Sequence, residues 1–149
     1  MSGRLPRRFR CAAALLASGA LWAAATVPAE AYEPHVNYML QCMGCHTPDG
    51  SGEPGRVPSI KETLAPFAAS PAGRRYLVQV PGASQSTLSD AELAQLLNWM
   101  IQNLSVKPAP FTAYTAAEVS SYRRSTLVAV KATRARLMLT LTGASAPKP

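Results

Sequence analysis

The residues with the clearest chemistry form one short string, Cys42-Met43-Gly44-Cys45-His46. Its C-x-x-C-H pattern is typical of covalent attachment of c-type haem. Two thiols three positions apart at the end of a helical turn can reach the two vinyl groups of one porphyrin as thioethers. The adjacent histidine then lies under the iron as its proximal ligand. We therefore predict Cys42 and Cys45 as haem anchors and His46 as the iron ligand, with covalent haem c and its iron as the cofactor.

A secretory leader is expected before this motif. Four arginines lie within the first ten residues, an apolar run follows from Cys11 to Val27, and Ala29-Glu30-Ala31 has the A-x-A pattern of a cleavage site. The alternative is an uncleaved membrane anchor, because 17 residues approach spanning length. Eight of its 17 residues are alanine, however, and it contains a serine and a glycine. We predict a signal peptide over residues 1–31, cleavage after Ala31, and location in the periplasm.

Other uses of the cysteine pair fit less well. A thioredoxin-like redox pair needs a βαβ context and no following histidine, and a zinc knuckle needs two further ligands. The chain beyond Ala31 has no third cysteine and, besides His46, only His35. A structural disulfide is permitted in an exported protein. Export, the use of both cysteines and the adjacent histidine together favour haem.

On these residues the chain resembles the class I cytochromes c. An aromatic residue stands four positions before the first cysteine in that family, as Tyr38 does here. A glycine-rich turn follows the motif, matched by Asp49-Gly50-Ser51-Gly52, and then a proline twelve residues after the histidine, matched by Pro58. The resemblance implies that the Pro58 carbonyl accepts the Nδ1–H of His46, a contact that fixes ring orientation and basicity. It also implies an all-α fold.

The family ends on a helix that packs across its first helix, and the residues from Ser89 to Leu104 predict one. Ser89 and Glu92 form an S-x-x-E capping box, and apolar residues then recur with helical spacing at Leu93, Leu96, Leu97, Met100, Ile101 and Leu104. Trp99 falls where the family places a large aromatic, and the resemblance implies that it packs against the first helix and the haem edge.

The family pattern fails at the second axial ligand. Most such cytochromes take a methionine from the loop before the last helix, but Pro71 to Leu88 contains none. Met100 is interpreted as core filler on the apolar stripe and as a weak candidate ligand. The iron would then be five-coordinate, water-ligated, or held by a donor from the Arg74–Ser86 loop or by Lys61. His35, just upstream of the motif, is interpreted as a surface or partly buried histidine.

Prolines and glycines interrupt the segment from Lys61 to Leu88, and we predict an irregular flap there. Tyr76-Leu77-Val78-Gln79-Val80 is its one extended-looking run, with a short helix near Arg74–Tyr76 as the other element. The pair Arg74 and Arg75 has two interpretations. It is either a solvated pair or the source of an arginine that meets a haem propionate.

Two helices are predicted after a stiff linker at Lys107-Pro108-Ala109-Pro110. Thr115-Ala116-Ala117-Glu118 is a second capping box that opens a helix through about Arg124, and a further helix runs from about Leu127 to Leu141. These helices either wrap the small haem core or present a basic surface. Residues 105–149 carry seven basic side chains and one acidic one, whereas residues 32–104 carry four basic and six acidic ones.

Length and composition restrict the classes. The chain has 149 residues, 48% of them hydrophobic and 15% charged, with a formal net charge of +7 and a mean hydropathy of +0.01. Two full domains, a disordered chain and a polytopic membrane protein are excluded. We predict an all-α protein: a signal peptide over 1–31, a small cytochrome c-like haem domain over 32–104, and a basic C-terminal helical extension over 105–149.

The predicted function is one-electron transfer by a periplasmic mono-haem c-type cytochrome that is not an enzyme. The expected partner is a periplasmic redox protein or a dehydrogenase to which the cytochrome is accessory, with loose membrane-surface association through the basic tail and no nucleic acid. The alternative is a haem protein that binds or senses small ligands at an open iron site. The missing loop methionine favours this alternative.

Overall fold

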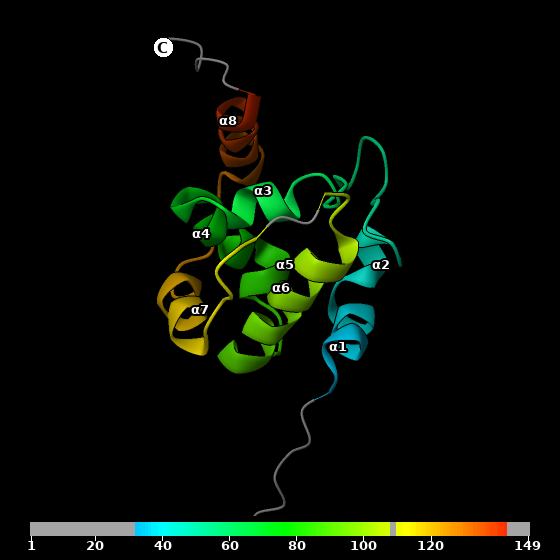
Figure 1. The fold of residues 1–149 in the computed structure, drawn as a ribbon, viewed down its shortest axis with the longest axis vertical. Helices are drawn as coiled ribbons and strands as arrows, with labels where there is room; N and C mark the ends of the chain where they lie inside the picture. Colours follow the sequence, from blue (N-terminus) through cyan, green and yellow to red (C-terminus); the bar gives the residue numbers. More distant parts are fainter. Residues whose placement is uncertain (1–31, 108–109, 143–149) are drawn as a thin grey trace, which may run out of the picture. The chain divides into compact units, whose positions relative to one another are not determined.

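The computed structural model describes residues 32–107 and 110–142. The predicted leader, Pro108 and Ala109 of the predicted linker, and the end of the tail lie outside these residues. The described chain is helical and has no strand, which confirms the predicted all-α class. Within it, no helix is long and apolar enough to cross a membrane. Figure 1 shows its helices α1 (Pro34–Gln41), α2 (Met43–His46), α3 (Leu64–Ala68), α4 (Pro71–Gln79), α5 (Pro81–Ser84), α6 (Asp90–Leu104), α7 (Ala116–Arg123) and α8 (Val130–Thr142).

Helices α1 and α6 pack together, as the resemblance implied (Figure 1). The predicted capping box at the start of α6 is present, because the Ser89 hydroxyl accepts from the Glu92 backbone and the Glu92 carboxylate accepts from the Ser89 backbone. Trp99 joins the two helices. Its ring centroid lies 5.7 Å from that of Tyr38 and 5.3 Å from that of His35, both on α1. This contact aligns the helix that leads into the cysteine motif.

The predicted extended run is wrong, because Tyr76 to Gln79 belongs to helix α4. Ser70 caps this helix by accepting a hydrogen bond from the Gly73 N–H at 3.1 Å, and Pro71 occupies its first turn. The helix buries Tyr76, Leu77 and Val78 against the core. This burial outweighs the β-propensity of the run. Such a propensity is easily overridden, because it reflects side-chain packing on a half-buried surface more than a preference of the backbone. The helix ends at Gln79, and the backbone of its C-cap Val80 is not helical, since the following Pro81 disfavours helical backbone at that residue.

The C-terminal residues share the core of the preceding helices. Tyr114, Val119 and Leu137 are buried in the same cluster as the residues of α3, α4 and α6. Helix α7 begins with the Thr115 cap that the sequence predicts, but only half of the predicted box forms. The carboxylate of Glu118 is bound instead by Arg74 of α4, at 2.7 Å from Nε and 2.6 Å from Nη2.

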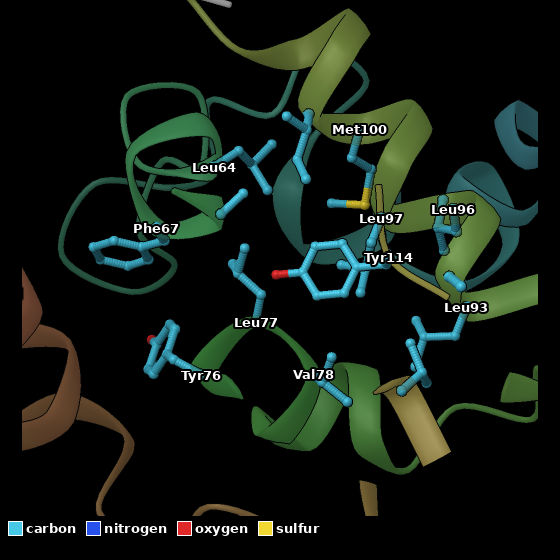
Figure 2. Packing of buried hydrophobic residues seen from close by; sticks show 14 of the residues in the cluster. Leu64, Phe67, Tyr76, Leu77, Val78, Leu93, Leu96, Leu97, Met100 and Tyr114 are labelled. Carbon is cyan, nitrogen blue, oxygen red and sulfur yellow. The ribbon is translucent and has the colours of Figure 1, made fainter. Parts of the chain in front are cut away.

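The core lies between α3, α4 and α6, with Tyr114 inserted from the segment before α7. Figure 2 shows the ring of Phe67 beside that of Tyr76, and the centroids of these rings are 5.5 Å apart in an edge-to-face arrangement. The Met100 side chain extends from α6 into the cluster, beside Leu97 (Figure 2). Of these side chains, Tyr76, Leu97 and Met100 also line the cavity described next.

Candidate functional site

A cavity of about 280 Å³ opens beside the cysteine motif. This volume is near the lower end of the range for small-molecule sites, well above that of a packing defect. Cys42, Cys45 and His46 line one side of it. The other walls are chiefly apolar and come from α3, α4, α6 and the residues that flank them: Leu64, Leu77, Val80, Leu88, Leu93, Leu96, Leu97 and Met100. The predicted site residues therefore lie together and face a mainly apolar space.

Cys42 is the residue between α1 and α2, and Cys45 lies within α2. The Cys42 carbonyl oxygen accepts hydrogen bonds from the Cys45 and His46 N–H groups at 3.1 and 2.9 Å. This single helical turn points both thiols toward the cavity, and both are free rather than joined in a disulfide. Burial, together with the nearby Cys45, raises the pKa of the Cys42 thiol to about 11. Cys42 is therefore a protonated thiol at neutral pH.

His46 is half-buried at the base of the cavity. Burial is the main cause of the lowered pKa of its imidazole, and Arg134 lowers this pKa further by charge repulsion. The Pro58 carbonyl is close enough to act in the opposite direction. No hydrogen bond of regular geometry reaches Nδ1, however, and this nitrogen is buried without a partner among the described residues. A neutral imidazole is the form that binds a metal ion.

The turn after the motif places Pro58 beside His46. The Tyr38 hydroxyl donates to the Thr47 carbonyl at 2.6 Å, and the Gly52 N–H donates to the His46 carbonyl at 3.1 Å. Gly52 has a φ of +68°, which glycine adopts without strain. A Cβ at this position would lie 2.5 Å from the Val57 carbonyl oxygen and 2.9 Å from that of Pro58. The backbone can thus approach closely only because residue 52 is glycine.

These features together fit a haem held by two thioethers. The wall has two thiols at helical spacing, a neutral imidazole with a buried free nitrogen, and an apolar surround. A zinc site does not fit, because no group of three or more histidine, cysteine or acidic side chains in the described ranges could hold a metal ion.

Two other predicted candidates lie away from the cavity. His35 is exposed and packs on Trp99, in agreement with its interpretation as a surface residue. Lys61 was a candidate axial ligand, but its Nζ donates to the Asp49 carboxylate at 2.8 Å. Trp99 packs against α1 as implied, yet it is not among the residues that line the cavity.

The arginines that reach the cavity are not those considered in the sequence. Arg74 forms its bidentate pair with Glu118, and its guanidinium lies 3.9 Å from the centroid of the Tyr114 ring. Arg75 lies over Tyr122, and neither arginine lines the cavity. The cavity is instead lined by Arg56 from the turn and by Arg134 from α8. The spacing of Val130, Arg134 and Leu137 is a helical stripe that could have indicated this inward face.

Comparison with known proteins finds relatives among the cytochromes c. No family model matches the chain. The chain is 31% identical over 107 residues to cytochrome c-552 of Thermus thermophilus, a match that covers 58% of this chain and 82% of that protein. The match to a second cytochrome c-552, from a named strain of the same organism, has the same identity and covers 72% of that relative. The chain therefore belongs to the c-type cytochromes, and its cofactor is covalently bound haem c with iron, as predicted.

Proposed function

We propose that this protein is an exported mono-haem cytochrome c of the class I accessory type, which carries one electron at a time and is not an enzyme. The observation that carries the proposal is the placement of Cys42, Cys45 and His46 on one wall of an apolar cavity. Haem supplies the reversible change between ferrous and ferric iron when it is bound. The protein residues anchor the cofactor, tune it and exclude water.

Each residue of the motif has a distinct role in this proposal. Cys42 and Cys45 are the two thioether anchors, and His46 is the proximal ligand of the iron. The buried Nδ1 of His46 needs a hydrogen-bond acceptor once the ring binds metal, and the Pro58 carbonyl is the nearby group that can serve. The apolar lining keeps the local dielectric low, so small changes in charge near the site shift the reduction potential.

The proposed location is the periplasm, and the proposed partner is an acidic redox protein or a dehydrogenase. The sequence before Ala31 supports export, because it has the basic start, apolar run and cleavage pattern of a signal peptide. Arg124 and Lys131 are exposed and supply positive charge for docking or for loose contact with a membrane face. Nucleic acid is not among the proposed partners.

Covalent attachment is the direct test of the proposal. Protein expressed in a periplasm with haem-attachment machinery should gain the mass of one haem and keep its colour through acid–acetone extraction. The double variant Cys42→Ala, Cys45→Ala should lose both properties. Complete extraction of haem from the wild-type protein would overturn the assignment of the two cysteines as anchors.

A second function is the binding of small ligands at an open iron site. It is favoured by the small number of side chains in the cavity wall that could bind the iron as a second axial ligand. Besides His46 and the two cysteines, the one side chain there with a soft donor atom is Met100, which is packed in the apolar stripe of α6. An iron without a strong second axial ligand can bind carbon monoxide or nitric oxide. Rapid binding of carbon monoxide by the ferrous protein would favour this function, whereas a six-coordinate spectrum that carbon monoxide leaves unchanged would favour electron transfer.

A further inference from the structure

Helix α8 turns one of its three basic residues toward the cavity. Val130 and Arg134 line the cavity, and Leu137, one turn further on the same face, is buried in the core. Lys131 and Arg136 are exposed on other faces of the helix. A stripe of two apolar residues with a cation between them is unusual, because a charge that leaves water needs compensation. The side chain of Arg134 is therefore the feature of α8 that requires an explanation.

Neutral groups hold Arg134 in position. Its Nη1 donates to the Thr63 hydroxyl at 3.3 Å, and its Nη2 donates to the Ser59 carbonyl at 3.1 Å. Its guanidinium carbon lies 5.7 Å from the centroid of the Phe67 ring. These contacts orient the guanidinium, but none of them neutralises its charge.

No carboxylate within the described residues lies within 4.0 Å of Arg134. Arg56, the other arginine of the cavity wall, already pairs with Glu53 at 3.0 Å and is largely exposed. The nearby Glu62 is exposed, and its lowered pKa is caused mainly by a hydrogen bond from Ser59 and only to a lesser extent by Arg134. Arg134 is thus a half-buried cation that faces the cavity without a carboxylate partner.

We infer that Arg134 binds a propionate carboxylate of the haem, which makes α8 part of the cofactor site. The inference rests on the proposed function, since the carboxylate belongs to the haem held by Cys42 and Cys45. Haem carries two propionates, and the planar fork of a guanidinium matches a carboxylate in a bidentate pair. Arg134, on the C-terminal helix, thus has the propionate-binding role that the sequence suggested for Arg74 or Arg75.

The test compares Arg134→Gln with Arg136→Gln, which removes the same charge from the exposed face of the same helix. The mass of each purified protein first establishes that one haem is attached, so failure of the proposed function is recognised separately. The reduction potential is then measured from pH 4 to pH 9. His46, Tyr76 and Glu62 also face Arg134, and its removal alters their titration as well. Both variants are therefore also measured with Glu62→Gln, which removes the one carboxylate among these groups.

Loss of a paired arginine raises the pKa of a carboxyl group by about one to three pH units. We therefore expect the pH at which the potential begins to change to move up by this amount in Arg134→Gln. Arg134→Lys should show a smaller shift, because it keeps the charge without the fork, and Arg136→Gln should match the wild type. Identical profiles for Arg134→Gln and Arg136→Gln would overturn the inference.

A second measurement needs no substitution, so it applies even if Arg134→Gln does not accumulate. In the diamagnetic ferrous protein, saturated with carbon monoxide if the iron binds it, NMR cross-peaks should connect the propionate methylene protons to the side chain of Arg134. Propionate cross-peaks only to other residues would show that α8 does not hold the cofactor.

Discussion

Replacement of Gly52 by alanine should damage the protein at the point where the turn meets the proximal histidine. Gly52 has a φ of +68°, and the left-handed region costs an alanine about 1–2 kcal/mol. The new Cβ would also lie 2.5 Å from the Val57 carbonyl oxygen and 2.9 Å from that of Pro58. Forced overpacking of this kind costs about 1–3 kcal/mol, so we expect a total loss of about 2–5 kcal/mol.

Gly55→Ala is the matched control for this substitution. Gly55 has a φ of +79° in the same turn, but nothing lies within 4 Å of a Cβ built there. This variant should lose only the backbone contribution, about 1–2 kcal/mol, less the small gain from a stiffer unfolded chain. The difference between the two variants therefore measures the steric pressure on the carbonyls of Val57 and Pro58.

Urea unfolding of both haem-loaded variants, with the slope of the transition checked for constancy, gives the two free energies. The reduction potential gives an independent result. A displaced Pro58 carbonyl alters the environment of His46, so Gly52→Ala should shift the potential and Gly55→Ala should not. Equal destabilisation by the two variants, with unchanged potentials, would refute the view that Gly52 lets the backbone hold Pro58 beside His46.

Three further substitutions test other parts of the structure. Met100→Leu should change the free energy of unfolding by less than about 1.5 kcal/mol, because it is a volume-conserving core substitution. The ferric wild type should lack the near-infrared sulfur-to-iron band. A band that is present in the wild type and disappears in the variant would make Met100 the axial ligand. Glu118→Gln should cost about 1–3 kcal/mol in a urea titration, because it leaves Arg74, whose side chain is 12% exposed, without its anion; a neutral result would mean that α7 is held by apolar contacts alone. Tyr38→Phe should cost about 1 kcal/mol through loss of the 2.6 Å bond to the Thr47 carbonyl. Burial raises the pKa of Tyr38 from 10.0 to about 12, so the hydroxyl keeps its proton to a higher pH in the folded state than in the unfolded state. The stability of the wild type therefore falls as the pH rises above 10. This fall should be shallower in Tyr38→Phe, and an unchanged slope would contradict the assignment of the raised pKa to Tyr38.

The parts of the fold that the sequence predicted depend on residues close together in the chain. The C-x-x-C-H motif spans five consecutive residues, so one helical turn brings its side chains to a single wall. The cap of α6 joins Ser89 to a residue three positions away, and the apolar stripe of that helix follows from its 3.6-residue period. Such patterns can be interpreted without knowledge of the fold, because the groups that interact are separated by one or two turns.

Tertiary structure alone decided the features that join distant segments. The run from Tyr76 to Gln79 is helical because α4 buries its apolar face on the core, which local propensity cannot reveal. Arg74 finds its anion 44 positions away, at Glu118, and this pair removes it from the cavity. Arg134 contacts Thr63 across 71 positions and faces the cavity in its place. An arginine that leaves water needs a partner, but which anion it meets depends on the packing of whole helices against one another.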